Sequence, residues 1–367
     1  MRAAGGNLLG RREENPIRLA KHQRNRYNSV ITERTENEKI PTRIQEENMK
    51  KKFKRTAAVL AVIFSLSFIA GCGSQNTETQ PSAEEAPSGS ITVTDMTGQT
   101  ITLDAPATKV VALTAADCEI VYALGAGDAV VGRGAYCDYP PDAQNVTAVQ
   151  SGAETNLEEI IALEPQVVFM DTMAQTEEQV KGLQDAGIQV VVSNATDIEG
   201  VYQSINIIGK VLGKEPEAES LIQEMKDTFE ALKSQVPAES GGTIYFEVSP
   251  LQYGLWTAGS GTFMDEMASM LGLQNIFSDV SGWAEISEEQ VLQRNPDYIV
   301  TITMDGSGTD PAAEILSRSG WEDITASKEQ RVLAAGNEMS RPGPRLADAA
   351  QELYTFVYES AAENKAA

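Results

Sequence analysis

The sequence predicts an α/β protein of two α/β lobes, each with a mainly parallel sheet, joined by one long interdomain helix. Short β-branched runs alternate with helical patterns from residue 91 onward, which is typical of strand–helix–strand units. One helical segment separates two sets of these runs, and two patterns found before it recur after it. The chain has 367 residues, 41% of them hydrophobic, which is enough for two packed cores.

Six short apolar runs predict the principal strands, because each is rich in β-branched residues and bounded by polar or turn residues. They are Lys109–Leu113, Val167–Met170, Gln189–Val192, Ile244–Val248, Tyr298–Ile302 and Arg331–Ala334.

The connecting helix is predicted over 216–237, between lobes at 91–215 and 238–363. Pro216 suits a first helical turn and Pro237 ends the helix. About twenty helical residues span on the order of 30 Å, enough to brace both lobes. Apolar residues recur in this segment at helical spacing, namely Leu221, Ile222, Met225, Phe229, Leu232 and Val236.

Two internal echoes indicate that the lobes are duplicated. The segment 157–169 matches 288–300 at a constant offset of 131 residues, each with an acidic start, a proline and a strand-like end. The segment 119–125 matches 266–272, and each predicts a helix closed by a C-terminal glycine.

The N-terminal region predicts export and lipid anchoring. From Met49, a cluster of basic residues precedes an apolar run and then Ile-Ala-Gly-Cys72, the layout of a signal peptide (49–72) whose end resembles the bacterial lipobox. Cys72 is the predicted lipidation site, and an uncleaved anchor helix is the alternative. Residues 1–48 are expected to be disordered or wrongly included, and 73–90 to form a flexible tether. The protein is thus expected to be extracytoplasmic and held at the cell membrane.

Charge and composition exclude several function classes. After Cys72 the chain has 14 lysine and arginine residues against 46 aspartate and glutamate residues, a net charge of −32, so no nucleic acid partner is expected. The one histidine, His22, precedes the signal-like segment, which argues against histidine catalysis and histidine-rich metal sites. Cys118 and Cys137 could form a disulfide or remain two thiols.

No motif of an enzyme is found. The chain has no Gly-x-Ser-x-Gly elbow, Walker loop or complete Gly-x-Gly-x-x-Gly fingerprint, so no catalytic residue, metal site or resident cofactor is predicted. An extracytoplasmic enzyme is the main rival class, and a structural adhesin or chaperone is another.

Residues 91–360 resemble a known family: the solute-binding proteins of ABC importers for cobalamin, ferric siderophores and haem, whose lobes are joined by one rigid helix. The resemblance implies an extracytoplasmic monomer that captures a metal chelate and docks on a permease dimer with its ATPase. Four stretches carry it by their order and spacing, namely 136–141, 156–165, 286–291 and 341–345.

The resemblance also implies two groups of site residues. Glu158 and Glu289, similar in position to the family's docking glutamates, are expected to engage arginine pockets on the permease. Each also begins a predicted helix, where a carboxylate is favoured. The ligand is expected between the lobes, at the carboxyl ends of the strands. The expected ligand-binding residues are Tyr136, Trp283 and Arg341, with Tyr253, Trp256 and Arg345 as further candidates.

The resemblance favours cobalamin as the ligand and leaves ferric siderophores and haem open. Gly152 and Asp171 stand where cobalamin binders of the family carry tryptophan, so part of an aromatic wall is missing. Haem would need an axial tyrosine or methionine, because no histidine remains after processing.

Overall fold

The computed structural model describes residues 89–152, 154–172, 176–238, 241–302 and 310–359. All of them belong to one unit of the chain, Ala83–Ala367. The predicted extension 1–48, the signal-like segment with Cys72, and tether residues 73–88 lie outside the described residues. In the described part, no helix is both long enough and apolar enough to cross a membrane.

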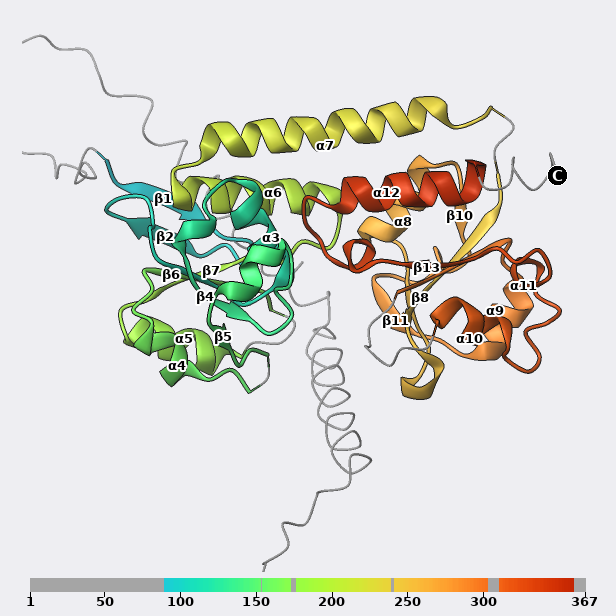
Figure 1. Cartoon of the computed structure of the whole chain (residues 1–367), viewed down its shortest axis with the longest axis horizontal. Coiled ribbons are helices and arrows are strands. Elements are labelled where there is room, and N and C mark those ends of the chain that lie inside the picture. Colours follow the sequence, from blue (N-terminus) through green and yellow to red (C-terminus); the bar gives the residue numbers. More distant parts are fainter. Residues whose placement is uncertain (1–88, 153, 173–175, 239–240, 303–309, 360–367) are drawn as a thin grey trace, which may run out of the picture. The chain divides into compact units, whose positions relative to one another are not determined.

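The first lobe (Figure 1) contains a five-stranded sheet. Its neighbouring strands are all parallel, in the order β5-β4-β3-β6-β7. A two-stranded antiparallel ribbon, β1 (Ile91–Thr94) with β2 (Thr100–Leu103), precedes it. The strands are β3 (Val110–Ala112), β4 (Val130–Gly134), β5 (Ala148–Val149), β6 (Val167–Met170) and β7 (Gln189–Val192), and the helices are α3 (Ala115–Ala123), α4 (Leu157–Ala162), α5 (Glu177–Asp185) and α6 (Ile198–Leu212).

The second lobe contains a mixed sheet in the order β11-β9-β8-β12-β13, with β10 paired to β8. The pairs of β8 with β10 and β12, and of β12 with β13, are parallel, whereas β9 and β11 are antiparallel additions at one edge. The strands are β8 (Thr243–Ser249), β9 (Trp256–Ala258), β10 (Gln274–Asn275), β11 (Trp283–Glu285), β12 (Tyr298–Ile302) and β13 (Val332–Ala335), and the helices are α8 (Phe263–Met270), α9 (Glu288–Arg294), α10 (Pro311–Leu316), α11 (Thr325–Lys328) and α12 (Leu346–Tyr354).

Strand alternation divides the core into clusters on the two faces of each sheet. On β6, Val167 and Phe169 join one cluster, while Val168 and Met170 join another. All four side chains are fully buried, as expected for a central parallel strand covered on both faces. The second lobe repeats the pattern on β8, β12 and their covering helices. Because side chains on both faces of these strands are buried, the sequence of each strand is a continuous run of apolar residues.

The long helix α7 (Glu215–Gln235) follows the first lobe and precedes the second, as predicted from 216–237. Pro216 is its second residue, and the helix ends just before Val236 and Pro237. It packs against α6 of the first lobe and α12 of the second (Figure 1). The buried stripe of α7 is Ala218, Ile222, Met225, Phe229 and Leu232. A single apolar face therefore contacts both lobes.

The six predicted strands are all present, with ends shifted by at most one residue. Both echoes also correspond to equivalent elements. The N-cap residues of α4 and α9 are Asn156 and Ser287, which are 131 positions apart, and the side chain of each accepts a hydrogen bond from its helix. At the ends of α3 and α8, Gly125 and Gly272 have φ values of 68° and 72°, a conformation that glycine adopts at little cost.

Candidate functional site

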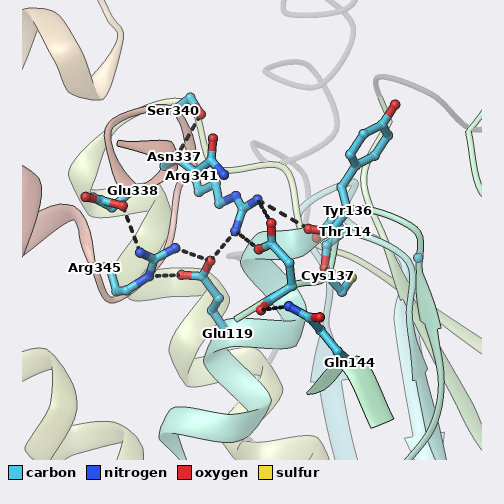
Figure 2. Close-up of polar contacts among 12 residues, drawn as sticks. Thr114, Glu119, Tyr136, Cys137, Gln144, Asn337, Glu338, Ser340, Arg341 and Arg345 are labelled. Carbon is cyan, nitrogen blue, oxygen red and sulfur yellow. Dashed lines mark hydrogen bonds and ion pairs between the residues drawn. The ribbon is translucent and has the colours of Figure 1, made fainter. Parts of the chain in front are cut away.

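A cluster of arginine and carboxylate side chains joins the two lobes at loops that follow the carboxyl ends of strands (Figure 2). Glu119 lies on α3, which follows β3, and Asp138 lies in the loop after β4. Arg341 and Arg345 lie between β13 and α12, beside the short helix η4 (Asn337–Ser340). We call Glu119, Asp138, Glu338, Arg341 and Arg345 the interlobe cluster. In α/β proteins the carboxyl ends of strands are where ligands bind.

Arg341 is held by the two carboxylates of the interlobe cluster that belong to the first lobe, those of Glu119 and Asp138. Its Nη1 donates to Glu119 Oε1 at 2.9 Å and to Asp138 Oδ1 at 2.6 Å. Its Nη2 donates to Asp138 Oδ2 at 3.2 Å and to the carbonyl oxygen of Tyr136 at 3.3 Å. The two bonds to Asp138 form a bidentate pair, a geometry that suits a planar guanidinium.

Arg345 uses all three of its nitrogens within the protein. Nε and Nη2 donate to the two oxygens of Glu119 at 2.9 Å and 2.8 Å, and Nη1 donates to Glu338 Oε2 at 2.8 Å. The guanidinium also stacks on the Tyr139 ring, 4.1 Å from its centroid. Arg345 therefore ties α12 to α3 through a carboxylate that is only 2% exposed.

The ion pairs shift the pKa values of Asp138, Arg341 and Arg345. Hydrogen bonds from Arg341 lower the pKa of Asp138, against a smaller opposing effect of burial. Burial by itself would lower the pKa of Arg341, but its bonds to Asp138 and Glu119 raise it, and Glu119 does the same for Arg345. The cluster thus holds two cations against three carboxylates.

Glu266, the counterpart of Glu119 in the second lobe, makes a matching contact across the lobes. Its Oε2 accepts a hydrogen bond of 2.8 Å from the backbone N–H of Ile198, the first residue of α6. Nearby, the N–H of Phe263 donates to the carbonyl oxygen of Thr196 at 2.9 Å. Each duplicated glutamate therefore contacts the start of the last helix of the opposite lobe.

The four aromatic residues predicted for the site are not gathered in one place. Tyr136, in the loop after β4, is 80% exposed, and its ring points away from the interlobe cluster (Figure 2). Tyr253, in a short helix after β8, is 70% exposed. Trp256 and Trp283 lie on β9 and β11, where the strand register places them diagonally on one face. Trp283 is half-buried and packs edge-on against Phe263, with ring centroids 5.6 Å apart.

The structure thus brings Tyr136 of the first lobe together with Arg341 and Arg345 of the second lobe. The two tryptophans and Tyr253 lie elsewhere in the second lobe. The sequence did not single out the acids that hold the two arginines. Glu119 lies in the repeated segment 119–125 and Asp138 in the family-like stretch 136–141, whereas Glu338 lies in neither kind of segment.

A second polar group lies at the carboxyl edge of the first sheet, around Asp117 of α3. Its side chain accepts a hydrogen bond from the Thr114 hydroxyl at 2.7 Å and another from the Ser193 hydroxyl. Burial raises the pKa of Asp117 to about 7, although these hydrogen bonds lower it, and the charge of Asp171 raises it further. The carboxyl therefore changes protonation state near neutral pH.

Replacing Asp117 by asparagine is expected to stabilise the protein increasingly as pH rises from 5 to 8. A buried carboxyl with a raised pKa stabilises the folded state while protonated, and this contribution is lost as pH rises through the folded-state pKa. The difference in unfolding free energy, variant minus wild type, should grow by up to about 1.4 kcal/mol per pH unit. Urea unfolding at several pH values measures it, and a difference independent of pH would contradict the assignment.

The two cysteines remain free thiols, one of the two alternatives left by the sequence. Cys118 and Cys137 are both buried, and Cys137 Sγ donates to the carbonyl oxygen of Thr114 at 3.2 Å. The hydrogen bond between the thiols, with burial, raises the pKa of Cys137. A buried thiol with a raised pKa, as at Cys137, is a poor nucleophile. Across the described ranges, no group of three or more histidine, cysteine or acidic side chains could hold a metal ion.

The predicted docking glutamates occupy equivalent, exposed positions. Glu158 is the second residue of α4 and Glu289 the second residue of α9. Hydrogen bonding with Ser287 and with its own backbone lowers the pKa of Glu289, so this carboxylate is charged at neutral pH. The neighbouring Glu288 differs, because its Oε2 accepts a hydrogen bond from the indole N–H of Trp321 at 2.9 Å. Of the two adjacent acids, Glu289 is the one that faces solvent.

Comparison with known proteins places this arrangement in a family. Residues 110–339 match the family described as periplasmic binding protein. The chain belongs to the periplasmic binding protein family. Its predicted resemblance to the solute-binding proteins of ABC importers, and its fold class of two α/β lobes, are thereby confirmed.

Individual members of this family are similar over most of the chain. An uncharacterized ABC transporter substrate-binding lipoprotein, YvrC, of Bacillus subtilis (strain 168) is 32% identical over 83% of this chain and 98% of its own length. A cobalamin-binding protein of Halobacterium salinarum (strain ATCC 29341 / DSM 671 / R1) is 29% identical over 80% of this chain and 82% of its own. The crystal structure of a possible iron-binding, periplasmic solute-binding protein of Staphylococcus epidermidis ATCC 12228 has 30% identity and a TM-score of 0.59, covering 69% of this chain and 99% of its own.

Proposed function

We propose that this member of the periplasmic binding protein family is the extracytoplasmic solute-binding component of an ABC importer for a metal chelate, with cobalamin as the first candidate. The observation that carries the proposal is the meeting of both lobes at the carboxyl ends of their strands, braced by α7. The similarity to an ABC transporter substrate-binding lipoprotein and to a cobalamin-binding protein supports it. Ferric siderophores and haem are the alternatives within the same fold.

The proposed ligand site lies between the lobes. Tyr136 and Tyr253 supply exposed aromatic rings, one from each lobe. Trp256 and Trp283 add a second aromatic surface on β9 and β11, and aromatic surfaces suit large planar chelates. Arg341 and Arg345 line the same loops, where their carboxylate partners fix them in place.

The proposed partners are a permease dimer with its ATPase. Glu158 and Glu289 stand at the second position of equivalent helices, one in each lobe. Two equivalent carboxylates suit two equivalent basic pockets, such as a dimer of permease subunits presents. The proposed anchor is a lipid on Cys72, as the lipoprotein relative suggests. An enzymatic role is disfavoured, because relatives of this family are substrate-binding proteins and the sequence has no catalytic motif.

Ligand titration tests the proposal. The purified protein is mixed with cyanocobalamin, haem or a ferric siderophore, and its thermal unfolding and tryptophan fluorescence are followed. A true ligand raises the unfolding temperature in proportion to the logarithm of its concentration. Failure of every chelate class to bind would refute the proposed function.

A further inference from the structure

Two exposed aliphatic side chains lie beside the proposed docking glutamates. In the part of the chain that the structure describes, five large hydrophobic side chains are exposed, and three of them are tyrosines. The other two are Ile161 on α4 and Leu292 on α9, which are 38% and 37% exposed. Like Glu158 and Glu289, they are 131 positions apart. A single exposed aliphatic residue is common on protein surfaces, but equal exposure at equivalent places of both lobes indicates a shared role.

Each aliphatic residue shares a helix face with a glutamate. Ile161 follows Glu158 by three residues, and Leu292 follows Glu289 by three residues. Residues three apart on a helix are surface neighbours, with Cβ atoms about 5–6 Å apart. Each helix therefore presents one carboxylate and one aliphatic side chain next to each other. We call Glu158 with Ile161, and Glu289 with Leu292, the docking pairs.

The packing of α4 and α9 orients the two docking pairs in the same way. The residue before each exposed aliphatic side chain, Ile160 or Val291, is fully buried and anchors its helix to the sheet. The buried residues of α7 belong to the core cluster on the opposite faces of the two sheets, so α4 and α9 cover the faces turned away from α7 (Figure 1). The order of buried and exposed residues over 157–165 is repeated, residue by residue, over 288–296.

The exposed aliphatic side chains do not contribute to the core of their own lobes. Among the described residues, the core clusters and the partly buried side chains packed against them include neither Ile161 nor Leu292. A partner that covers these two side chains would remove apolar surface from water, which favours association. The neighbouring carboxylate restricts the chemistry of that partner, because the covering surface must offer a basic group about one helical turn away.

We infer that a permease subunit recognises each docking pair through a two-part pocket, in which an apolar patch covers the aliphatic side chain beside the basic group that receives the glutamate. The inference rests on the proposed function and deepens its docking step. Because the two docking pairs are equivalent, the partner that fits them presents the same pocket twice, as a dimer of identical permease subunits does. The apolar part also excludes water from the ion pair, which strengthens the electrostatic attraction.

Binding to the permease at several salt concentrations tests the inference. The probe is the permease–ATPase complex that supports chelate uptake together with this protein, reconstituted in lipid nanodiscs, and surface plasmon resonance measures the dissociation constant. The variant Ile161→Ser/Leu292→Ser should bind roughly 10-fold more weakly at every salt concentration, because two apolar contacts are lost. Its affinity should still fall with added salt as steeply as that of the wild type, because both ion pairs remain.

Two further variants distinguish the parts of the pocket. Glu158→Gln/Glu289→Gln removes the charges and should leave a weaker affinity that depends little on salt. The exchange Ile161→Leu/Leu292→Ile keeps the aliphatic surface and is the matched control, which should bind as the wild type does. All the substituted side chains are exposed, so circular dichroism and chelate affinity should be unchanged in every variant.

The outcomes separate the inference from the proposed function. Unchanged affinity of the serine variant, a loss confined to low salt, or an equal loss in the exchange variant would overturn the two-part pocket while leaving the proposed function intact. If no permease–ATPase complex supports chelate uptake with this protein, or if the wild type does not bind that complex, the proposed function fails and the inference fails with it.

Discussion

Replacing Arg318 by methionine is expected to lower the free energy of unfolding by about 3–5 kcal/mol, the largest effect on stability predicted for a single side chain. Arg318 and Glu247 form a bidentate pair with both bonds at 2.7 Å, and their side chains are 3% and 1% exposed. Removal of the guanidinium leaves a carboxylate on β8 in an apolar interior that contains Tyr245 and Trp321. Denaturant unfolding followed by circular dichroism measures the loss.

Burial already raises the pKa of Glu247 in the native protein, although Arg318 acts in the opposite direction. Without Arg318 the pKa should rise further. A carboxyl with a raised folded-state pKa stabilises while protonated, so the loss in Arg318→Met should be smaller at pH 5 than at pH 8. The double variant Arg318→Met/Glu247→Gln should recover part of the stability, because no buried charge remains.

The matched control is Lys181→Met, which removes an exposed pair with Asp185. It is expected to cost less than about 1 kcal/mol. If both single variants lose the same small amount of stability, the buried pair does not have the role assigned to it.

The second large effect concerns docking. Charge reversal of both Glu158 and Glu289 to lysine should lower chelate uptake by roughly 100-fold or more, while the purified variant keeps its ligand affinity. Each substitution would replace an anion by a cation opposite the basic pocket proposed on the permease. Both side chains are exposed on short helices, so the fold should tolerate the change. Uptake is measured in cells that lack the native protein and express either form.

The control carries the same change of charge at other exposed positions. Glu178 is the second residue of a capped helix in the first lobe, as Glu158 is, and Glu219 is exposed on α7. The variant Glu178→Lys/Glu219→Lys should transport normally. Normal uptake by the Glu158/Glu289 variant, or an equal loss in the control, would refute docking through this pair.

The sequence by itself determined six principal strands, the connecting helix and their order. Short apolar runs rich in β-branched residues indicate strands covered on both faces, and such runs made β6, β7 and β12 predictable to the residue. Proline at each end of one amphipathic stretch fixed α7, and acidic helix starts at an offset of 131 residues revealed the equivalent N-termini that carry Glu158 and Glu289. These features depend on local backbone and hydration preferences, which a sequence shows directly.

The partners of the charged side chains were decided only by the tertiary structure. Arg341 lies 222 residues from Glu119, and Ser193 lies 76 residues from Asp117. An arginine in a loop can bind a ligand or form an ion pair with an acid of the protein, and the residue type alone does not distinguish the two roles. In the folded chain Glu119 is buried beside the guanidinium groups of Arg341 and Arg345. Both arginines therefore pair with the protein, because a carboxylate removed from water requires a compensating charge.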